Sequence, residues 1–416
     1  MIMKKITLSI VGLFLFAAAW AADFTPGNLV VLRVGDGSST LSNASTAIFL
    51  DEYTTDGTLV QSVDIPTSGE NLLTNSGSAT SEGQLTLSPD QSLLALAGYN
   101  VEPGTTGVAS TDAATVNRKI ISVDYTGTVK NALLSATAYN GNNIRGAVTN
   151  GVDFWASGTA TTVAAGGVQY FGTGTPTQVS STSTNIRVIN IFNGQLYYSS
   201  SAKTGYGIFA VGEGMPIVSG ITSTLIINMP QVSSTNASPY AFSFNATSTV
   251  AYIADDNSTS KGGGIQKWTF SDGNWSKAYT LGATGFRGLT VDWSATNPKI
   301  FATGTDNNLY SVTDDGSGTS TPNIIASGAT NTAIRGVAFV PIRKTESHVV
   351  TPIIASMKIL NNEISFDVLP QSDIQIYSIT GSRIASYLPA KVIELNLTKG
   401  IYIIKVENQS AKIVLK

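Results

Sequence analysis

Arginine recurs at one position of an internal repeat in this 416-residue chain. Six segments share a pattern in which a marker residue precedes alternating apolar positions, and successive markers lie 62, 42, 53, 47 and 48 residues apart. The markers are Gly83, Arg145, Arg187, Tyr240, Arg287 and Arg335, with Glu82 directly before the first. Guanidinium groups gathered at one place can bind a carboxylate, sulfate or phosphate through paired hydrogen bonds. We therefore take the four arginines, Tyr240 and Glu82 as a candidate ligand-binding site, with Tyr240 as a stacking or hydrogen-bonding wall.

A residue that recurs in every repeat can also serve the repeat itself. An arginine between neighbouring sheets can pair with a carboxylate or with loop carbonyl groups, without any ligand. The sequence favours this structural role for the arginines and leaves ligand binding as the alternative.

Histidine and cysteine chemistry is nearly excluded by composition. The chain has no cysteine, and its one histidine, His348, follows the repeats. A Ser-His-Asp triad within the repeats and a multi-histidine zinc site are therefore ruled out. If the protein is an enzyme, Glu82 is the best candidate for its catalytic acid or base. A second carboxylate within about 5–10 Å of Glu82 would support glycoside hydrolysis, and pairing with an arginine alone would support binding.

Acidic loops provide a weaker candidate site. Asp255, Asp256 and Asp306 lie in Asn-rich segments, and oxygen ligands at close spacing suit Ca²⁺. None of these segments matches an EF-hand loop, and Asp and Asn side chains also stabilise ordinary turns. The sequence favours the turn role, so we expect no cofactor and keep Ca²⁺ as the alternative.

The repeats predict an all-β fold. Each contains four runs with the period-two alternation of strands, and their spacing is typical of propeller blades. Residues 334–341 form a first strand without successors, whereas residues 28–65 contain three strands without a first. Joining the two ends completes a sixth blade and removes exposed sheet edges. We therefore predict a six-bladed β-propeller over residues 22–343.

A different composition begins after a predicted linker, residues 344–351. Seven short strands are predicted in residues 352–416, which is typical of a small Ig-like β-sandwich. Three segments stand out here, namely Ile376-Tyr377-Ser378-Ile379-Thr380-Gly381-Ser382-Arg383-Ile384, Leu395-Asn396-Leu397-Thr398-Lys399-Gly400-Ile401-Tyr402-Ile403-Ile404-Lys405-Val406 and Lys412-Ile413-Val414-Leu415-Lys416. In order, spacing and position this region resembles the C-terminal sorting domain of Bacteroidetes type IX secretion cargo. The resemblance implies passage across the outer membrane, with the type IX machinery as partner.

Residues 1–21 are predicted to be a signal peptide. Lys4 and Lys5 precede the apolar run from Ile6 to Ala19, and Ala19-Trp20-Ala21 supplies the small residues that signal peptidase requires. No other stretch is apolar and long enough to span a membrane. We expect export by the Sec pathway and a location outside the cell or on its outer-membrane surface.

Charge narrows the choice of partner. The chain carries 24 basic against 27 acidic residues, and the excess of acid lies before residue 352. Nucleic acid is therefore an unexpected partner, since it requires a basic surface.

We favour a binding propeller for a glycan or another anionic molecule. Four tryptophans could stack on sugars, although packing within the repeats explains them more simply; they are Trp155, Trp268, Trp275 and Trp293. The alternatives are a carboxylate-based glycan hydrolase or lyase, a calcium-dependent lactonase, and a surface protein scaffold. The propeller region also resembles uncharacterised bacterial propeller proteins with similar Asn-Ile-Arg-Gly stretches, which implies no activity.

Overall fold

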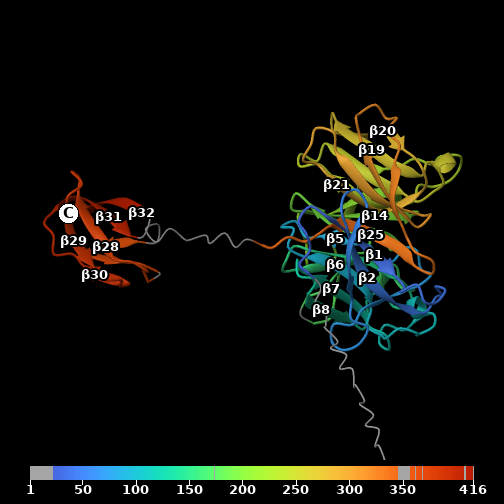
Figure 1. The fold of residues 1–416 in the computed structure, drawn as a ribbon, viewed down its shortest axis with the longest axis horizontal. Coiled ribbons are helices and arrows are strands. Elements are labelled where there is room, and N and C mark those ends of the chain that lie inside the picture. The colour runs from blue at the N-terminus through green and yellow to red at the C-terminus, as the bar shows by residue number, and fades with distance from the viewer. Residues whose placement is uncertain are drawn as a thin grey trace, which may run out of the picture. The chain divides into compact units, whose positions relative to one another are not determined.

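The computed structural model describes residues 22–172, 174–344, 357–360, 362–367, 369–406 and 409–415. These residues form strands and three short 3₁₀ helices, and the chain divides into two compact units, Met1–Arg343 and Lys344–Lys416 (Figure 1). The 3₁₀ helices are η1 (Val108–Ser110), η2 (Val163–Ala165) and η3 (Thr259–Lys261). Within the described ranges no helix has the length and hydropathy to cross a membrane. The predicted signal peptide, His348 and most of the predicted linker lie outside the described residues.

Four sheets of the first unit repeat one plan, in which four consecutive strands pair antiparallel with their neighbours. Their strands are β9 (Ile144–Thr149), β10 (Phe154–Gly158), β11 (Val168–Tyr170) and β12 (Thr177–Ser180); β13 (Ile186–Phe192), β14 (Gln195–Ala202), β15 (Gly205–Val211) and β16 (Ser223–Asn228); β17 (Pro239–Phe244), β18 (Val250–Asp255), β19 (Gly264–Ser271) and β20 (Asn274–Leu281); β21 (Phe286–Asp292), β22 (Lys299–Gly304), β23 (Asn308–Thr313) and β24 (Asn323–Ser327). Alternation of apolar and polar residues explains these strands, because successive side chains point to opposite faces.

The remaining strands of this unit form one nine-stranded sheet with two four-stranded parts. One part runs β25-β1-β2-β3 and the other β5-β6-β7-β8, and β4 pairs with both β2 and β6. The strands are β1 (Leu29–Val34), β2 (Ser45–Tyr53), β3 (Leu59–Asp64), β4 (Thr74–Ser76), β5 (Thr86–Leu87), β6 (Leu94–Tyr99), β7 (Arg118–Val123), β8 (Val129–Ser135) and β25 (Ala333–Phe339). Because β25 pairs with β1, the last strand of the unit shares a sheet with its first three.

The inner strands lie against one another in a closed circuit. Strand β5 contacts β9, and contacts continue through β13, β17, β21 and β25 back to β5. Antiparallel sheets arranged around a common centre define a β-propeller, which leaves only short edges at its rim. The fold class predicted from the alternation, all-β with a propeller arrangement, is therefore confirmed.

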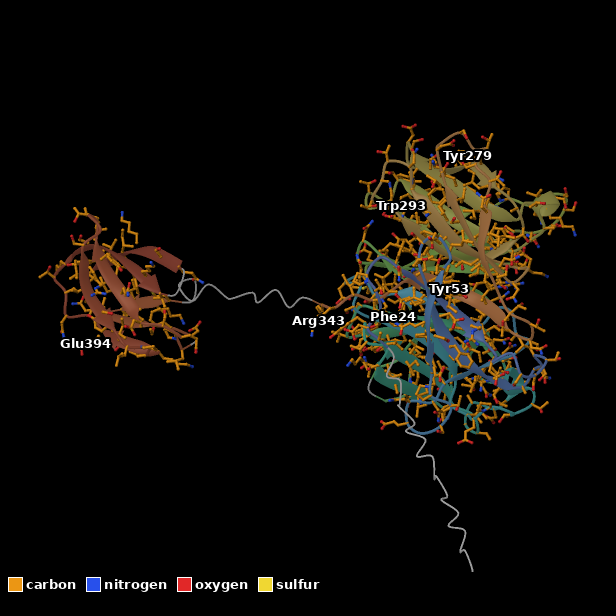
Figure 2. The ribbon with its side chains drawn as sticks, viewed as in Figure 1. Phe24, Tyr53, Tyr279, Trp293, Arg343 and Glu394 are labelled. Carbon is orange, nitrogen blue, oxygen red and sulfur yellow. The ribbon has the colours of Figure 1, made fainter. Side chains whose placement is uncertain are left out.

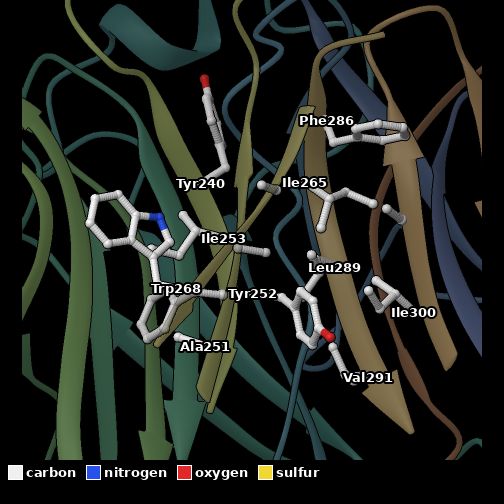
Figure 3. Close-up of a cluster of buried hydrophobic side chains, with 14 of the residues drawn as sticks. Tyr240, Ala251, Tyr252, Ile253, Ile265, Trp268, Phe286, Leu289, Val291 and Ile300 are labelled. Carbon is white, nitrogen blue, oxygen red and sulfur yellow. The ribbon is translucent and has the colours of Figure 1, made fainter. Parts of the chain in front are cut away.

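Apolar side chains fill the space between neighbouring sheets. Between β17–β20 and β21–β24, the cluster includes Ile253, Ile265, Leu289 and Ile300, all buried (Figure 3). Each such side chain contributes about 1.5–3 kcal/mol when fully buried. The figure also shows Tyr240 at the opposite end of the cluster from Val291, with its hydroxyl pointing away from the apolar residues. The marker residue Tyr240 therefore lies at one end of this apolar cluster.

The two ends of the first unit meet at one turn. The Phe24 amide donates a hydrogen bond to the Tyr125 carbonyl at 2.7 Å. The guanidinium of Arg343 lies 5.4 Å from the centroid of the Tyr125 ring. Phe24 and Arg343 are labelled in Figure 2. The chain therefore enters and leaves this unit beside the turn between β7 and β8.

The second unit consists of two antiparallel sheets around one apolar core. One sheet is β26-β27-β30 and the other β29-β28-β31-β32. The strands are β26 (Lys358–Leu360), β27 (Glu363–Ser365), β28 (Ile374–Ser378), β29 (Arg383–Tyr387), β30 (Val392–Glu394), β31 (Gly400–Val406) and β32 (Gln409–Leu415). Ile364 and Ile393 from one sheet share a buried cluster with Ile376, Ile404 and Ile413 from the other. The described residues of this unit form seven strands, the number that the sequence predicts.

The glycine after the marker permits close packing of the inner strands. The Gly336 amide donates to the Gly83 carbonyl at 2.9 Å, which joins the segment before β5 to β25. A Cβ atom at Gly336 would lie 2.4 Å from the Leu85 nitrogen and 2.7 Å from the Gly83 oxygen. Both are backbone atoms, so a side chain here would force two strands apart.

We expect Gly336→Ala to lower the free energy of unfolding by about 2 kcal/mol or more, because overpacking displaces the backbone. Gly282→Ala is the matched control, since Gly282 is exposed and its added methyl would meet only a Thr259 methyl at 3.5 Å. Urea unfolding followed by tryptophan fluorescence reports on the first unit, which contains every tryptophan after residue 21. Equal unfolding midpoints for the two variants would contradict the close approach.

Candidate functional site

A β-bulge occurs at the marker residue in five of the six repeats. The pairing between the first and second strands skips the marker and resumes beyond it. The skipped markers are Arg145 in β9, Arg187 in β13, Tyr240 in β17, Arg287 in β21 and Arg335 in β25. A bulge leaves its extra residue out of the ladder and redirects that side chain. The bulges therefore give the markers directions that simple alternation does not predict.

Arg145 and Arg335 bind oxygen atoms at or before the start of the next inner strand. Nη1 of Arg145 donates to the Asn185 side-chain oxygen at 2.6 Å and to the Ile186 carbonyl at 3.0 Å. Arg335 donates from Nη2 to the Gly77 carbonyl at 2.9 Å and from Nη1 to the Ala79 carbonyl. Burial lowers the pKa of each arginine to about 10. These contacts match the structural role that the sequence favours.

Arg187 and Arg287 lie on either side of Tyr240 in the repeat order and both contact its ring. Their guanidinium carbons are 4.6 and 5.6 Å from the Tyr240 ring centroid. Arg187 also donates from Nη1 to the Tyr240 hydroxyl, and Arg287 donates from Nε to Asp256 at 2.9 Å. Cation–π contacts of this kind are strengthened by burial, and Tyr240 is only 2% exposed. Tyr240 thus forms a wall shared by two cations.

The four marker arginines form what we call the arginine cluster, and its positive charge is incompletely neutralised. Its members are Arg145, Arg187, Arg287 and Arg335. Two carboxylates act on its four guanidiniums: Asp256 pairs with Arg287, and the charge of Glu82 acts on Arg145 and Arg335. After burial, the charge of Arg187 further lowers the pKa of Arg145, and that of Arg287 lowers the pKa of Arg335. Nε of Arg145 and Nε of Arg187 are buried without a hydrogen-bond partner in the described structure. The cluster therefore has positive charge that its own carboxylates do not balance.

Glu82 holds a loop in place and is completely buried. One carboxylate oxygen accepts the Ser76 amide at 2.8 Å, and the other accepts the Tyr99 hydroxyl and the Asn143 side-chain amide, both at 2.5 Å. Burial raises the pKa of Glu82, and these hydrogen bonds oppose that rise. None of the three donors is a carboxyl group or an arginine. The contacts give Glu82 a positioning role within the β5–β6 sheet.

Arg118 is a buried cation that the sequence reasoning included only as part of a strand. Its two Nη atoms donate to oxygens of Ala109, Thr111, Val116 and Asn142 at 2.8–3.1 Å. It also lies 5.1 Å from the centroid of the Tyr99 ring, which links it to the Glu82 network. In the sequence, an Arg-Lys pair stands at the start of an apolar strand. A charged side chain in such a strand needs buried polar partners, and this feature could have identified Arg118.

The calcium candidates contact protein groups. Asp255 accepts the amides of Ser238 and Asn257, each at 3.0 Å, and the Tyr310 hydroxyl donates to Asp306 at 2.5 Å. Asp256 is the partner of Arg287 described above. In the described ranges no group of three or more His, Asp or Glu side chains is arranged to hold a metal ion. The observed contacts are those of turns and ion pairs.

The cavity inside the ring is lined by uncharged residues, both apolar and polar, and is separate from the arginines. It has a volume of about 230 Å³ and is lined mainly by residues near the ends of the inner strands, among them Leu87, Phe192, Phe244, Val291 and Val337. The markers lie at the beginnings of the same strands. Cavity and arginine cluster therefore occupy opposite ends of the channel.

The tryptophans differ in environment. Trp155 and Trp268 are buried at 0% and 4% exposure, and Trp155 donates from Nε1 to the Pro216 carbonyl at 2.8 Å. Trp293 donates to the Ser243 hydroxyl at 3.0 Å and lines the central cavity. Trp275 is partly exposed beside a surface groove. Packing explains the positions of Trp155 and Trp268, which is the role that the sequence favoured.

Comparison with known proteins finds distant structural similarity. No family model matches the chain, and no curated protein matches it in sequence. Among solved structures, a nidogen/laminin complex gives a TM-score of 0.46 at 11% identity, covering 74% of this chain and 97% of the other. The periplasmic gluconolactonase PpgL of Pseudomonas aeruginosa gives 0.41 at 14% identity, covering 88% and 98%. A GH74 enzyme of Niastella koreensis gives 0.42 at 14% identity, covering 73% and 46%. Similarity this weak says nothing about what the chain binds.

Asp255 should make the protein less stable as the pH rises. Burial raises the pKa of this carboxyl to about 6, above its ordinary value of 3.8. Between these values the folded protein binds a proton that the unfolded chain releases, so stability is full at the acid end and falls toward pH 6. The fall from this group is on the order of 2–3 kcal/mol. Glu82, whose pKa is also raised, adds a change of the same sign.

Urea unfolding at a series of pH values from about 4 to 7 measures this effect. In the Asp255→Asn variant the loss of stability with rising pH should be smaller, and the part that comes from Glu82 should remain. Asp315→Asn is the control, because hydrogen bonds lower the pKa of that exposed carboxyl and its titration lies below this range. A slope unchanged by Asp255→Asn would show that the buried carboxyl does not titrate there.

Proposed function

We propose that the protein is an exported binding propeller that holds an anionic ligand at its arginine cluster. The observation that carries this proposal is the excess of guanidinium charge around Tyr240, together with the buried Nε groups of Arg145 and Arg187 that have no protein acceptor. A buried donor without an acceptor is costly, and like charges at close range repel one another. A carboxylate or sulfate group beside the guanidiniums would offset this repulsion. Uronic acids and sulfated sugars of extracellular glycans carry these groups.

The ring architecture supports a count of six blades. Six inner strands contact in a circuit, and each heads a set of four antiparallel strands, the set headed by β25 being completed by β1, β2 and β3. Arginines from four blades lie near the beginnings of the inner strands, at one end of this ring. A ligand bound there would be held by several blades at once, which suits recognition of a branched or polymeric anion.

Catalysis by Glu82 is the second candidate and has less support. Its hydrogen bonds to Ser76, Tyr99 and Asn143 use both oxygens, and burial keeps the carboxyl from solvent. Its raised pKa is a property that catalytic acids share. The hydrogen bonds therefore favour a structural role.

Binding to polyanions tests the proposal. Polygalacturonate and dextran sulfate should bind the full chain, and neutral dextran should not bind at the arginine cluster. Arg287→Ala should weaken binding of the polyanions at least tenfold, since it removes a charged hydrogen-bonding group worth about 1.5–3 kcal/mol. Isothermal titration at low and high salt measures the affinity, which should fall with salt.

Lys277→Ala is the control for this experiment, because it removes one positive charge from an exposed position on β20. Equal losses in the two variants would mean that net charge, not the cluster, drives binding. Release of new reducing ends from polygalacturonate, abolished in Glu82→Gln, would make the protein an enzyme.

For the second unit we propose the role of a type IX sorting domain. The segments that carry the resemblance fall on defined elements: the Gly381 turn between β28 and β29, strand β31, and strand β32 near the C-terminus. Gly381 has φ +87°, a conformation that favours glycine. Secretion of the propeller to the cell surface or medium would follow from this role, after Sec-dependent export directed by residues 1–21.

Deleting residues 409–416 should stop export beyond the outer membrane in a Bacteroidetes host with type IX machinery. The deletion removes β32, whose Ile413 and Leu415 side chains are buried in the unit's core. Immunoblots of periplasm, cell surface and medium measure the outcome, with Lys358→Ala, an exposed position on β26, as the control. Export of the truncated chain at the level of the full chain would refute the role.

A further inference from the structure

A surface groove separates the outer parts of two neighbouring sheets, β13–β16 and β17–β20. Its volume is about 460 Å³, within the range of small-molecule sites. The groove is lined by aromatic side chains, among them Tyr197, Phe270 and Trp275, and by side chains with hydroxyl or amide groups, among them Gln195 and Thr249. None of its lining residues is charged.

The β19–β20 hairpin presents two aromatic rings to this groove. Phe270 and Trp275 lie directly opposite each other in the ladder, so their side chains share one face of the hairpin. Their ring centroids are 5.4 Å apart. Asp272 and Gly273, both with positive φ, form the two-residue turn that fixes this register. Phe270 is 40% exposed, so the hairpin presents an aromatic surface to solvent instead of burying it.

The aromatic surface continues inward to the central channel. The Phe244 ring lies 5.5 Å from Trp275 and 5.0 Å from Tyr197, measured between centroids. Phe192 is 5.5 Å from Phe244 on its other side, and Phe244 lines both the groove and the central cavity. Rings from two sheets thus form a continuous row from rim to channel.

Hydroxyl groups are held along one side of the groove. The Asn245 side chain accepts the amide of Thr249 at 2.8 Å and donates to the hydroxyls of Thr247 and Thr249, each at 3.1 Å. Asn193, from the other sheet, donates to the Ser248 hydroxyl at 2.8 Å. These contacts fix the turn between β17 and β18. The Thr247 and Thr249 hydroxyls also bond each other at 2.8 Å, so one of these two keeps a proton to donate.

We propose that this groove binds a neutral oligosaccharide. A pyranose ring has apolar C–H faces and a rim of hydroxyl groups, so it matches aromatic rings bordered by hydroxyl and amide side chains. The uncharged lining offers no partner to a carboxylate or sulfate, which distinguishes this groove from the arginine cluster. Trp275 and Phe270 stack on the sugar faces, and Thr247 and Thr249 bond the hydroxyls.

Titration of the full chain with neutral hexasaccharides tests the groove. The probes are cellohexaose, xylohexaose, mannohexaose and maltohexaose, with hexagalacturonate as the charged comparison. At least one neutral probe should bind, change the tryptophan fluorescence and show little dependence on salt. Trp275→Ala should weaken that binding at least tenfold and Trp275→Phe should restore most of it, whereas Tyr53→Ala, a partly exposed aromatic on β2, should have no effect.

Two results would overturn the proposal. One is the absence of binding by every neutral probe at about 10 mM, a concentration above the dissociation constant of even a weak site. The other is neutral-sugar binding that survives in Trp275→Ala while this variant unfolds at the same urea concentration as the wild type. Arg287→Ala should leave the neutral site intact, so failure here and failure of the anion site are separate outcomes.

Discussion

Two of the marker residues, Arg145 and Arg187, each connect their own sheet to both neighbours. The Arg145 carbonyl accepts the Gln84 amide from the preceding sheet at 3.1 Å, while its guanidinium reaches Asn185 of the following sheet. Arg187 does the same, since its carbonyl accepts the Ser157 hydroxyl at 3.1 Å and its side chain contacts Tyr240. The backbone bulge makes this double connection possible, because it turns the side chain out of the ladder. The ring depends on these joints as much as on the apolar packing between sheets.

This use of arginine has an electrostatic consequence. Joints made from carbonyl acceptors satisfy the hydrogen bonds of a guanidinium without cancelling its charge. Arg145 and Arg335 form such joints, and together with Arg187 and Arg287 they concentrate positive charge at one end of the channel, although the chain as a whole carries −3. The opposite end holds no comparable charge and is lined by Phe192, Phe244 and Val291. Structural and binding roles of the arginines are therefore compatible, and the first creates the conditions for the second.

Strand positions could be predicted from the sequence because alternation of apolar residues is a local property. The spacing of the markers likewise indicated which residues occupy equivalent positions near the beginnings of the inner strands. The bulges were not predicted, since a skipped residue leaves no mark in a pattern such as Ile-Arg-Gly-Val. The partners of Glu82 and Arg118 were also missed, because Asn143 approaches Glu82 only after two sheets have packed and Arg118 binds carbonyl groups of loops. The groove beside Trp275 depends on a pair of rings across a hairpin and on a turn of another strand pair, which no spacing along the chain specifies.

Strand β25 closes the ring at Phe339, before the chain passes Tyr125 and reaches Arg343. A protease that cuts beyond Lys344 would therefore release the first unit with every one of its sheets complete. Because Phe24 also contacts Tyr125, a short artificial peptide could join the two ends and new termini could be opened in an exposed hairpin such as Asp272-Gly273. A chain with its blades in a permuted order would thus form the same ring, which would make this propeller a suitable scaffold for circular permutation.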